Sequence, residues 1–357
     1  MMRADFGGVA GDWLAPGGPD ADVVISTRIR LARNVSNHKM PWRMKADEQA
    51  AIEAYLRDRI QASAAIDSST YFNLSTLDEP SRLLLVERHL VSRELAKKEG
   101  DRGVIFSAGE STSVMINEED HLRLQVIRGG LRIEECWRDI DRLDDSLSDC
   151  IDFAWTPELG YLTACPTNVG TGIRVSVMAH LPTLVETKQI TKVEKAAAQV
   201  GLVIRGLYGE GTKSYGDLYQ ISNQVTLGLS EAAVIENVRK FAAKIIQWER
   251  GVRSLLLEQH RTSIDDKVRR SLLALRETNS ISFDAAMREV SAVRLGVVLN
   301  LLRGISMQTI NEVMLFIQPA HLICLRGALP VAAERDRVRA DFIRERLKSE
   351  DSLNLGS

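Results

Sequence analysis

The chain has 357 residues, which at roughly 150 residues per domain predicts about two domains and a core that needs no disulfide or metal to hold it together. Lys and Arg total 46 against 48 Asp and Glu, and this balance argues against a dedicated binder of nucleic acid, which would be strongly basic. Of the basic residues, 34 are arginine, the bidentate ligand of phosphates. Either oxyanion chemistry or a coding bias would explain that excess.

Targeting and crosslinking signals are missing from the sequence. The first residues are neither basic nor apolar enough for a signal peptide, and no uninterrupted apolar run approaches the about 18 residues of a membrane helix. The four cysteines are scattered, without the spacing of a zinc site or a disulfide framework. We therefore expect a cytoplasmic protein that does not enter a membrane.

The first part of the chain alternates between strand and helix patterns. Residues 1–20 are rich in glycine and predict a flexible lead-in. Strands are expected at 104–106, 113–116, 122–126, 161–165, 173–178, 202–205 and 221–227, and helices at 45–62, 81–98, 137–150, 183–199 and 230–259. The connections between strands are too short for crossovers, so the sheet should be antiparallel. Ser230 is the expected N-cap of the last helix.

Beyond about residue 260 the pattern becomes helical throughout. Helices are expected at 264–277, 283–302 and 332–348. The sequence thus predicts an α+β fold, with an antiparallel sheet flanked by helices and an all-α domain after it. The predicted divisions are 1–20, 21–258 and 259–357.

Two charged clusters stand out in the first part of the chain. Arg28 and Arg30 would share one face of a strand, which lets two guanidiniums converge on a polyphosphate, although a solvated face is the commoner outcome. The second cluster, residues 117–123, places three acids in a row between two apolar strands. It forms either a solvated turn or part of a site at a sheet edge.

Two glycine-containing loops follow. Residues 165–174 contain a Gly-x-Gly pair that could cradle an anion or simply make a turn. Residues 205–214 look like a phosphate-binding loop, but Thr212 breaks the Walker A pattern and Ser214 stands where the dinucleotide motif needs its third glycine. Together the four clusters supply arginines, carboxylates and a cysteine, a combination that suits phosphoryl transfer.

These segments resemble the signatures of the ATP:guanidino phosphotransferases, the family of creatine and arginine kinases. They read STRIRLARN from Ser26, NEEDHLR from Asn117, CPTNVGTGIR from Cys165 and RGLYGEG from Arg205. The similarity covers roughly residues 20–255 and is closest to the bacterial protein arginine kinase branch. It implies that family's fold, ATP as phosphoryl donor, Mg²⁺ carried by the nucleotide, and no metal site built by the protein alone.

The resemblance also implies roles for individual residues. Five arginines would hold the ATP phosphates, and His89 would pack against the adenine. The implied ATP-binding residues are Ser26, Thr27, Arg28, Ile29, Arg30, His89, Arg123, Arg174, Val175, Ser176, Val177, Met178, Arg205, Gly206, Leu207, Tyr208, Gly209 and Glu210. Glu119 and Glu210 would hold the acceptor guanidinium, with Cys165 beside it.

The chemistry of the acceptor supports two carboxylates. A guanidinium has a pKa above about 12 and is not nucleophilic while fully protonated. One carboxylate can accept its proton as the N–P bond forms while the other orients the attacking nitrogen. We predict Glu119 as the base and Glu210 as the clamp, with Cys165 adding negative charge as a thiolate or serving only as a small buried residue.

Two departures from the small-molecule enzymes favour the protein arginine kinase branch. Only about 25 residues precede Ser26, too few for the helical domain that closes over a free amino acid in those enzymes, so we expect an open acceptor site. The helical tail resembles that branch's C-terminal domain. Its RDxxRA motif, Arg335, Asp336, Arg337, Val338, Arg339 and Ala340, implies an allosteric phosphoarginine pocket, although Asp336 and Arg339 would also make an ordinary helix ion pair.

The expected function is transfer of the ATP γ-phosphoryl group to arginine side chains in proteins, which marks them for Clp-type degradation and inactivates a heat-shock repressor. The resemblance implies as partners arginine-containing substrates, that repressor, a zinc-binding activator protein and a Clp unfoldase–protease. Apolar stripes in the tail favour a homodimer. Two alternatives stay open: a small-molecule guanidino kinase, and a non-catalytic adaptor that binds phosphoarginine and delivers clients to a protease.

Overall fold

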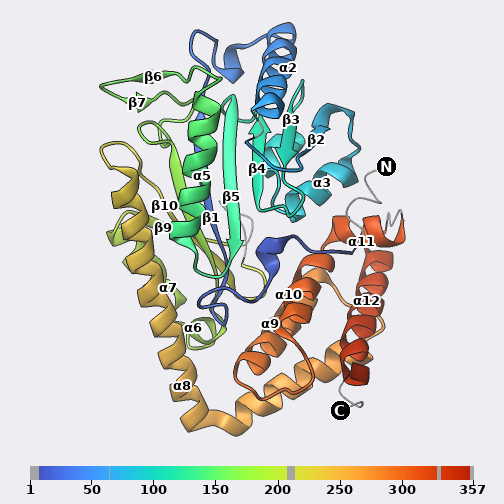
Figure 1. Ribbon diagram of the computed structural model, residues 1–357. Helices are drawn as coiled ribbons and strands as arrows, with labels where there is room; N and C mark the ends of the chain where they lie inside the picture. Colours follow the sequence, from blue (N-terminus) through green and yellow to red (C-terminus); the bar gives the residue numbers. More distant parts are fainter. Residues whose placement is uncertain (1–7, 64, 207–213, 328–330, 354–357) are drawn as a thin grey trace.

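The computed structural model describes residues 8–63, 65–206, 214–327 and 331–353 (Figure 1). The strands are β1 (Val24–Arg33), β2 (Thr70–Asn73), β3 (Gly103–Phe106), β4 (Thr112–Ile116), β5 (Leu122–Gly129), β6 (Trp155–Thr156), β7 (Gly160–Tyr161), β8 (Ile173–His180), β9 (Leu202–Arg205) and β10 (Leu218–Asn223). The α-helices are α2 (Ala46–Ala62), α3 (Glu79–Glu87), α4 (Arg93–Lys97), α5 (Ile133–Ser148), α6 (Pro182–Glu186), α7 (Ile190–Gln199), α8 (Glu231–Glu277), α9 (Phe283–Val298), α10 (Met307–Phe316), α11 (Pro319–Arg326) and α12 (Ala332–Leu353), and the 3₁₀ helices are η1 (Asp12–Leu14), η2 (Pro41–Arg43) and η3 (Leu74–Thr76).

A large antiparallel sheet organises the first part of the chain. Its strand order is β2-β3-β4-β5-β1-β8-β10-β9, and each strand runs antiparallel to its neighbours. Helices flank the sheet, and a helical region follows it (Figure 1). The predicted fold class is confirmed.

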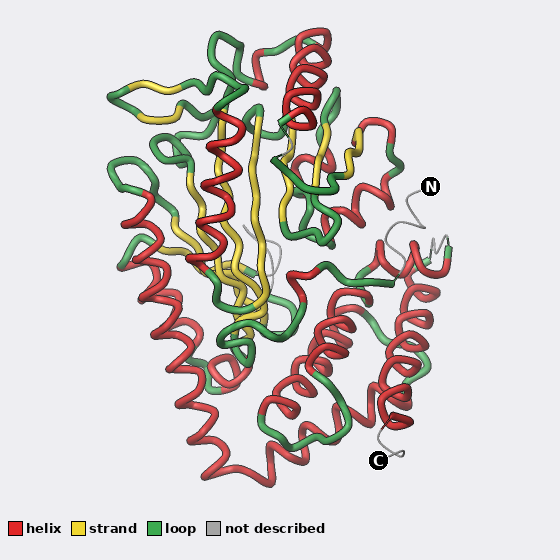
Figure 2. Tube along the Cα trace, in the orientation of Figure 1, coloured by secondary structure: helices red, strands yellow, loops and turns green. Residues whose placement is uncertain are grey.

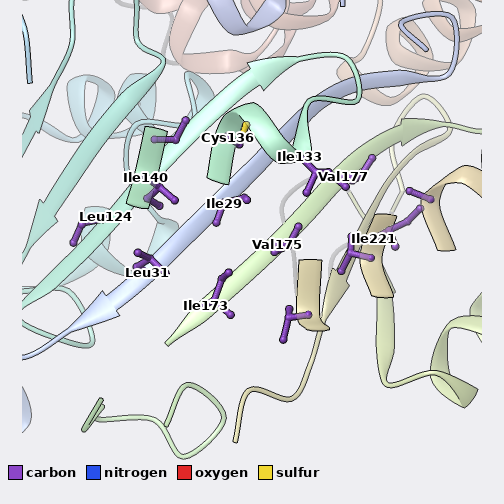
Figure 3. Close-up of a cluster of buried hydrophobic side chains, with 14 of the residues drawn as sticks. Ile29, Leu31, Leu124, Ile133, Cys136, Ile140, Ile173, Val175, Val177 and Ile221 are labelled. Carbon is purple, nitrogen blue, oxygen red and sulfur yellow. The ribbon is translucent and has the colours of Figure 1, made fainter. Parts of the chain in front are cut away.

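The alternation of residues along β1 divides the sheet into two faces. Ile29 and Leu31 are buried in the main core, where they pack with β8 and with α5, whose Cys136 and Ile140 lie on the same side (Figure 3). Side chains of a strand alternate between faces, so Arg28 and Arg30 point to the other side. One face is therefore the apolar core, and the opposite face carries the arginines.

The helical region begins within α8, which is continuous in hydrogen bonding but kinked at His260. The hydroxyl of Ser230 accepts a hydrogen bond from the backbone N–H of Ala233, which confirms the predicted N-cap. Beyond the kink, α9, α10 and α12 share a second core that includes Leu275 and Phe316. Figure 2 shows this last part of the chain as helices joined by loops, without strands. The proposed division at 258/259 lies beside this kink and stays a prediction.

The structure corrects several predicted elements. The helix expected at 81–98 is two helices, because His89 adopts a left-handed φ of 60° between α3 and α4. The helix expected at 183–199 likewise divides into α6 and α7 at Lys188. The strand expected at 161–165 is limited to Tyr161, and the strand expected at 221–227 is shifted toward the N-terminus as β10.

The start of the described chain packs against the sheet instead of forming the lead-in that its composition predicted. Trp13 and Leu14 of η1 are only 3% and 4% exposed and belong to the second core. The backbone N–H of Asp12 also donates to the carbonyl of Gly109. Two large apolar side chains thus outweigh the turn signals around them, and residues 1–7 lie outside the described part of the chain.

No helix among the described residues combines the length and apolarity needed to cross a membrane.

Two fully buried histidines should make the fold sensitive to acid. Burial lowers the pKa of His121 from 6.5 to about 4, and burial together with the charge of Arg294 lowers the pKa of His180 well below 6.5. The unfolded chain takes up these protons near pH 6.5 whereas the native protein does not, so stability falls as the pH falls from about 6.5 toward 4. Each histidine contributes at most about 1.4 kcal/mol per pH unit in that window.

Urea unfolding between about pH 7.5 and 5 checks this expectation. The variant His121→Gln should show a shallower loss of stability with falling pH than the parent protein. The exposed His260 of α8 provides the control, His260→Gln. An unchanged pH slope in His121→Gln would contradict the assignment.

Candidate functional site

The arginine-bearing face of the sheet forms the floor of an open cleft of about 740 Å³. Strands β1, β5, β8, β9 and β10 reach it, together with α4 and the loops that follow β4 and β7. Its lining includes Arg28, Arg30, Arg123, Arg174, Arg205, Gln220, Glu118, Glu119, Glu94, Lys97, Lys98, Cys165, Thr167 and Asn168. The structure thus brings all five predicted phosphate arginines together with Glu119 and Cys165.

The strand register places like charges next to one another. Arg30 of β1 lies directly opposite Arg174 of β8, and Arg28 lies opposite Ser176. Like charges directly across a strand pair are destabilising. The arrangement is unfavourable for the fold alone, and a bound anion would relieve it.

The lowered pKa values of these arginines also suit a site for an anion. Burial, with repulsion from Arg174 and Arg123, lowers the pKa of Arg28 to about 10, and burial with the charge of Arg28 lowers the pKa of Arg30 well below its usual value. The buried Nε of Arg30 has no hydrogen-bond partner among the residues that the structure describes. Arg28 donates to Gln220 Oε1 at 2.7 Å. A polyanion in the cleft would satisfy and stabilise these cations.

The acidic loop after β4 contains two glutamates with different surroundings. Glu118 is 3% exposed and accepts hydrogen bonds from Arg123 Nη1 and Ser92 Oγ, both at 2.6 Å. Burial alone would raise the pKa of Glu118, but the charge of Arg123 and these hydrogen bonds outweigh it and lower the pKa. Glu119 is 44% exposed, and its Oε2 lies 3.5 Å from Arg123 Nη2. Glu119 is therefore the accessible carboxylate.

Asp120 joins the acidic loop to the loop that carries Cys165. Its Oδ1 accepts hydrogen bonds from the backbone N–H of Ala164 and from Asn34 Nδ2, both at 2.6 Å. The Oδ1 of the same Asn34 side chain accepts a hydrogen bond from the backbone N–H of His121 at 2.8 Å. Segments far apart in the sequence are therefore held together, and Glu119 and Cys165 reach the same cleft.

The glycines of the 165–174 loop allow it to approach the sheet. Gly172 has a φ of 66°, and a Cβ there would lie 2.7 Å from the carbonyl oxygen of Ala32. Any larger residue would collide with the end of β1. The Sγ of Cys165 lies 3.0 Å from Thr167 Oγ1 within this loop.

The remaining predicted ATP-binding residues divide into three groups. The side chains of Thr27, Ile29, Val175 and Val177 are buried on the core side, so only their backbone could contact a nucleotide. Ser26, Ser176, His89 and Met178 line smaller cavities beside the cleft. Gly206 ends the described part of its loop, and Leu207, Tyr208, Gly209 and Glu210 lie outside the described residues.

His89 lies in the turn after α3, not on a helix as its sequence context suggested. Its ring packs edge-to-face against Trp13 with ring centroids 5.0 Å apart. Burial and the charge of Arg28 lower the pKa of His89 to about 3, so its ring is neutral. A neutral ring suits contact with a flat, uncharged base.

The RDxxRA segment lies on α12. Asp336 pairs with Arg339 at 2.5 Å, which is the predicted helix ion pair. Arg339 is 2% exposed, and it also donates to the carbonyls of Ile317 and Ile281 at 2.9 and 3.0 Å. These bonds fix α12 against the end of α10 and the start of α9.

Sequence reasoning missed several residues of the site. Glu118, Asp120 and Asn34 hold the loops in place, while Lys98 and Gln220 line the cleft. Glu118 and Asp120 flank Glu119 in a run of three acidic residues, and that run was a visible signal for both. The partners of Asn34 and Gln220 are distant in the sequence, so no local pattern could have identified them.

Comparison with known proteins identifies the family. The family model described as "ATP:guanido phosphotransferase, C-terminal catalytic domain" matches residues 51–252. The model described as "Protein-arginine kinase McsB C-terminal domain" matches residues 261–355. A protein-arginine kinase of Halothermothrix orenii is 43% identical over 335 residues, which span 94% of this chain and 96% of the relative. The chain belongs to the protein-arginine kinase family. The predicted family is thus confirmed.

Other relatives agree with that assignment. The protein-arginine kinase of Moorella thermoacetica is 42% identical over 338 residues, covering 94% of this chain and 97% of the relative. Among solved structures, lombricine kinase matches with a TM-score of 0.57 and 26% identity, over 69% of this chain and 72% of that one. The duplicated taurocyamine kinase of Schistosoma mansoni matches with a TM-score of 0.60 and 28% identity. The match covers 68% of this chain and 34% of that protein.

Proposed function

We propose that this protein transfers the γ-phosphoryl group of ATP to the guanidino group of arginine residues in proteins. The observation that carries the proposal is the cleft in which five arginines, Glu119 and Cys165 meet. Membership of the protein-arginine kinase family, over almost the whole chain, supports the same reaction.

The arginines supply the donor half of the reaction. Phosphoryl transfer needs charge neutralisation on the phosphates and alignment of the reacting groups more than covalent chemistry. Arg28, Arg30 and Arg174 lie on adjacent strands, and Arg123 and Arg205 extend the same surface. Because the strands are rigid, the cationic groups are in place before ATP binds, which lowers the cost of reorganisation.

Glu119 supplies the acceptor half. The attacking guanidinium nitrogen must lose a proton as its bond to phosphorus forms, and a carboxylate in the cleft can accept it. Glu118 is held by Arg123 and Ser92, whereas Glu119 faces the open cleft. We assign Glu119 as the base and Cys165 as a neighbour of the guanidinium. Glu210 as a second clamp is proposed from the family motif alone.

The cleft fits a Mg²⁺ that arrives with the nucleotide better than one held by the protein. Glu118 and Glu119 both lie against Arg123, which competes for their charge. When bound, Mg²⁺ would neutralise phosphate oxygens of ATP, and the residues of the cleft would orient the phosphates and accept the proton.

Incubation with ATP, Mg²⁺ and an arginine-rich protein should yield acid-labile phosphoarginine. Phosphopeptide mass spectrometry at neutral pH detects the product, and free arginine and creatine are the competing acceptors. A clear preference for either small molecule would instead support the alternative of a small-molecule guanidino kinase. A protein that binds phosphoarginine but transfers nothing would support the adaptor alternative.

We further propose the finer roles that the family resemblance implies. These are an allosteric phosphoarginine pocket at 335–340, a homodimer formed through 259–357, and action in the cytoplasm. A heat-shock repressor, a zinc-binding activator and a Clp unfoldase–protease are the proposed partners. The match of residues 261–355 to the protein-arginine kinase C-terminal domain supports this set of proposals.

A further inference from the structure

A second cavity lies next to the arginine cleft, where the sheet meets the helical region. It measures about 40 Å³. Ser26, His89 and Met178 line it from the sheet side, and Met287 of α9 with Met314 and Leu315 of α10 line it from the other side. The C-terminal helices thus form one wall of this cavity, and the residues on the sheet side form the other.

A smaller void of about 10 Å³ lies between this cavity and the cleft. It shares Ser26, His89 and Met178 with the cavity and Arg28 and Gln220 with the cleft. A continuous line of residues therefore runs from the phosphate arginines, past His89, to the methionines of α9 and α10. This is the order in which an extended nucleotide presents its phosphates, sugar and base.

We propose that Met287 and Met314 of the C-terminal helices form one wall of the subsite for the purine of ATP, and that binding of the base displaces this wall. The inference rests on the proposed function, because it takes ATP as the donor. It assigns nucleotide contacts to a region beyond the catalytic motifs.

The size of the cavity requires the displacement. An apolar cavity that accommodates benzene measures about 150 Å³, and a purine is larger than benzene. The about 40 Å³ present here therefore leaves no room for the base while the wall stays where it is. Three methionines, Met178, Met287 and Met314, surround the space. Their side chains are unbranched and change rotamer readily, and thioethers pack favourably against aromatic rings.

The wall is connected to the rest of the molecule by α10. Asn311 Nδ2 donates to the carbonyl of Leu14 at 3.3 Å, and Asn311 Oδ1 accepts from Arg294 Nε at 3.3 Å. Met314 follows Asn311 by one helical turn. Displacement of Met314 by a base would therefore be transmitted through Asn311 to η1 and α9. The helical region would then respond directly to nucleotide binding.

The variant Met314→Trp tests the proposal, because it fills the space that the base must enter. We expect the dissociation constant for ATP, measured by calorimetry, to rise by about tenfold or more, since overpacking opposes the displacement. Inorganic tripolyphosphate, which needs only the arginine cleft, should bind as in the parent protein, within about twofold. Met307→Trp, on the same helix but outside the cavity lining, is the matched control and should leave both constants unchanged.

Further measurements separate the possible outcomes. Met287→Phe, on α9, should weaken ATP in the same direction and leave tripolyphosphate unaffected, and thermal unfolding of each variant shows that it is folded. Unchanged ATP binding in both variants, or equal weakening of ATP and tripolyphosphate, would overturn the inference. If the parent protein bound no ATP at all, the proposed function itself would be wrong.

Discussion

Glu119→Gln should reduce the turnover of protein arginine phosphorylation by roughly 10² to 10⁴-fold, the usual contribution of a general base. The substitution keeps the size of the side chain and removes its ability to accept a proton. Glu119 faces the open cleft, and its contact with Arg123 spans 3.5 Å, so the arginines should stay in place. Single-turnover kinetics should show a slow chemical step with the affinity for ATP within about threefold of the parent value.

The adjacent glutamate provides the matched control. Glu118→Gln makes the same chemical change one residue away, but it weakens the bonds of Glu118 to Arg123 and Ser92. Arg123 would then be less well positioned for phosphate, so we expect a higher KM for ATP as the main effect. A near-normal turnover in Glu119→Gln, or a purely chemical defect in Glu118→Gln, would show that the two roles are reversed.

Side-chain alternation predicted that Arg28 and Arg30 would share one face if they lay on a strand, although no strand was predicted at β1 itself. Arg28 and Arg30 alternate with Ile29 and Leu31, and the structure places the first pair in the cleft and the second in the core. The same rule puts Arg33 with the core side. There it is 2% exposed and pairs with Asp144 at 2.7 Å. A local pattern was sufficient because the direction of a strand side chain depends only on its position.

Features that depend on distant residues could not be predicted in this way. The turn at His89 interrupts a segment whose apolar spacing is helical, and it places the ring against Trp13 of the N-terminal segment. Asp120 connects two loops through the backbone N–H of Ala164, a contact between residues 44 positions apart. The methionine wall comes from helices that follow the catalytic motifs. In each case the partner is fixed by tertiary packing, not by neighbours in the sequence.

Arg30→Met should abolish most of the activity and yet stabilise the fold. Arg30 lies opposite Arg174, its Nε is buried without a hydrogen-bond partner among the described residues, and burial lowers its pKa. Removal of one donor that stabilises transition-state charge costs about 10² to 10³-fold in turnover. Relief of the repulsion and of the desolvated charge should raise the free energy of unfolding by about 1 kcal/mol. Urea unfolding and phosphoryl-transfer kinetics measure the two effects.

The same substitution three residues along the strand should have the opposite effect on stability. Arg33 donates to both carboxylate oxygens of Asp144, and its guanidinium lies 3.5 Å from the ring centroid of Tyr161. Arg33→Met would leave Asp144 buried and unpaired, which costs about 3 to 5 kcal/mol. The expected signs differ because the two arginines occupy opposite faces of one strand. If Arg30→Met were also strongly destabilising, the cleft arginines would be part of the structural framework instead of a site prepared for phosphate.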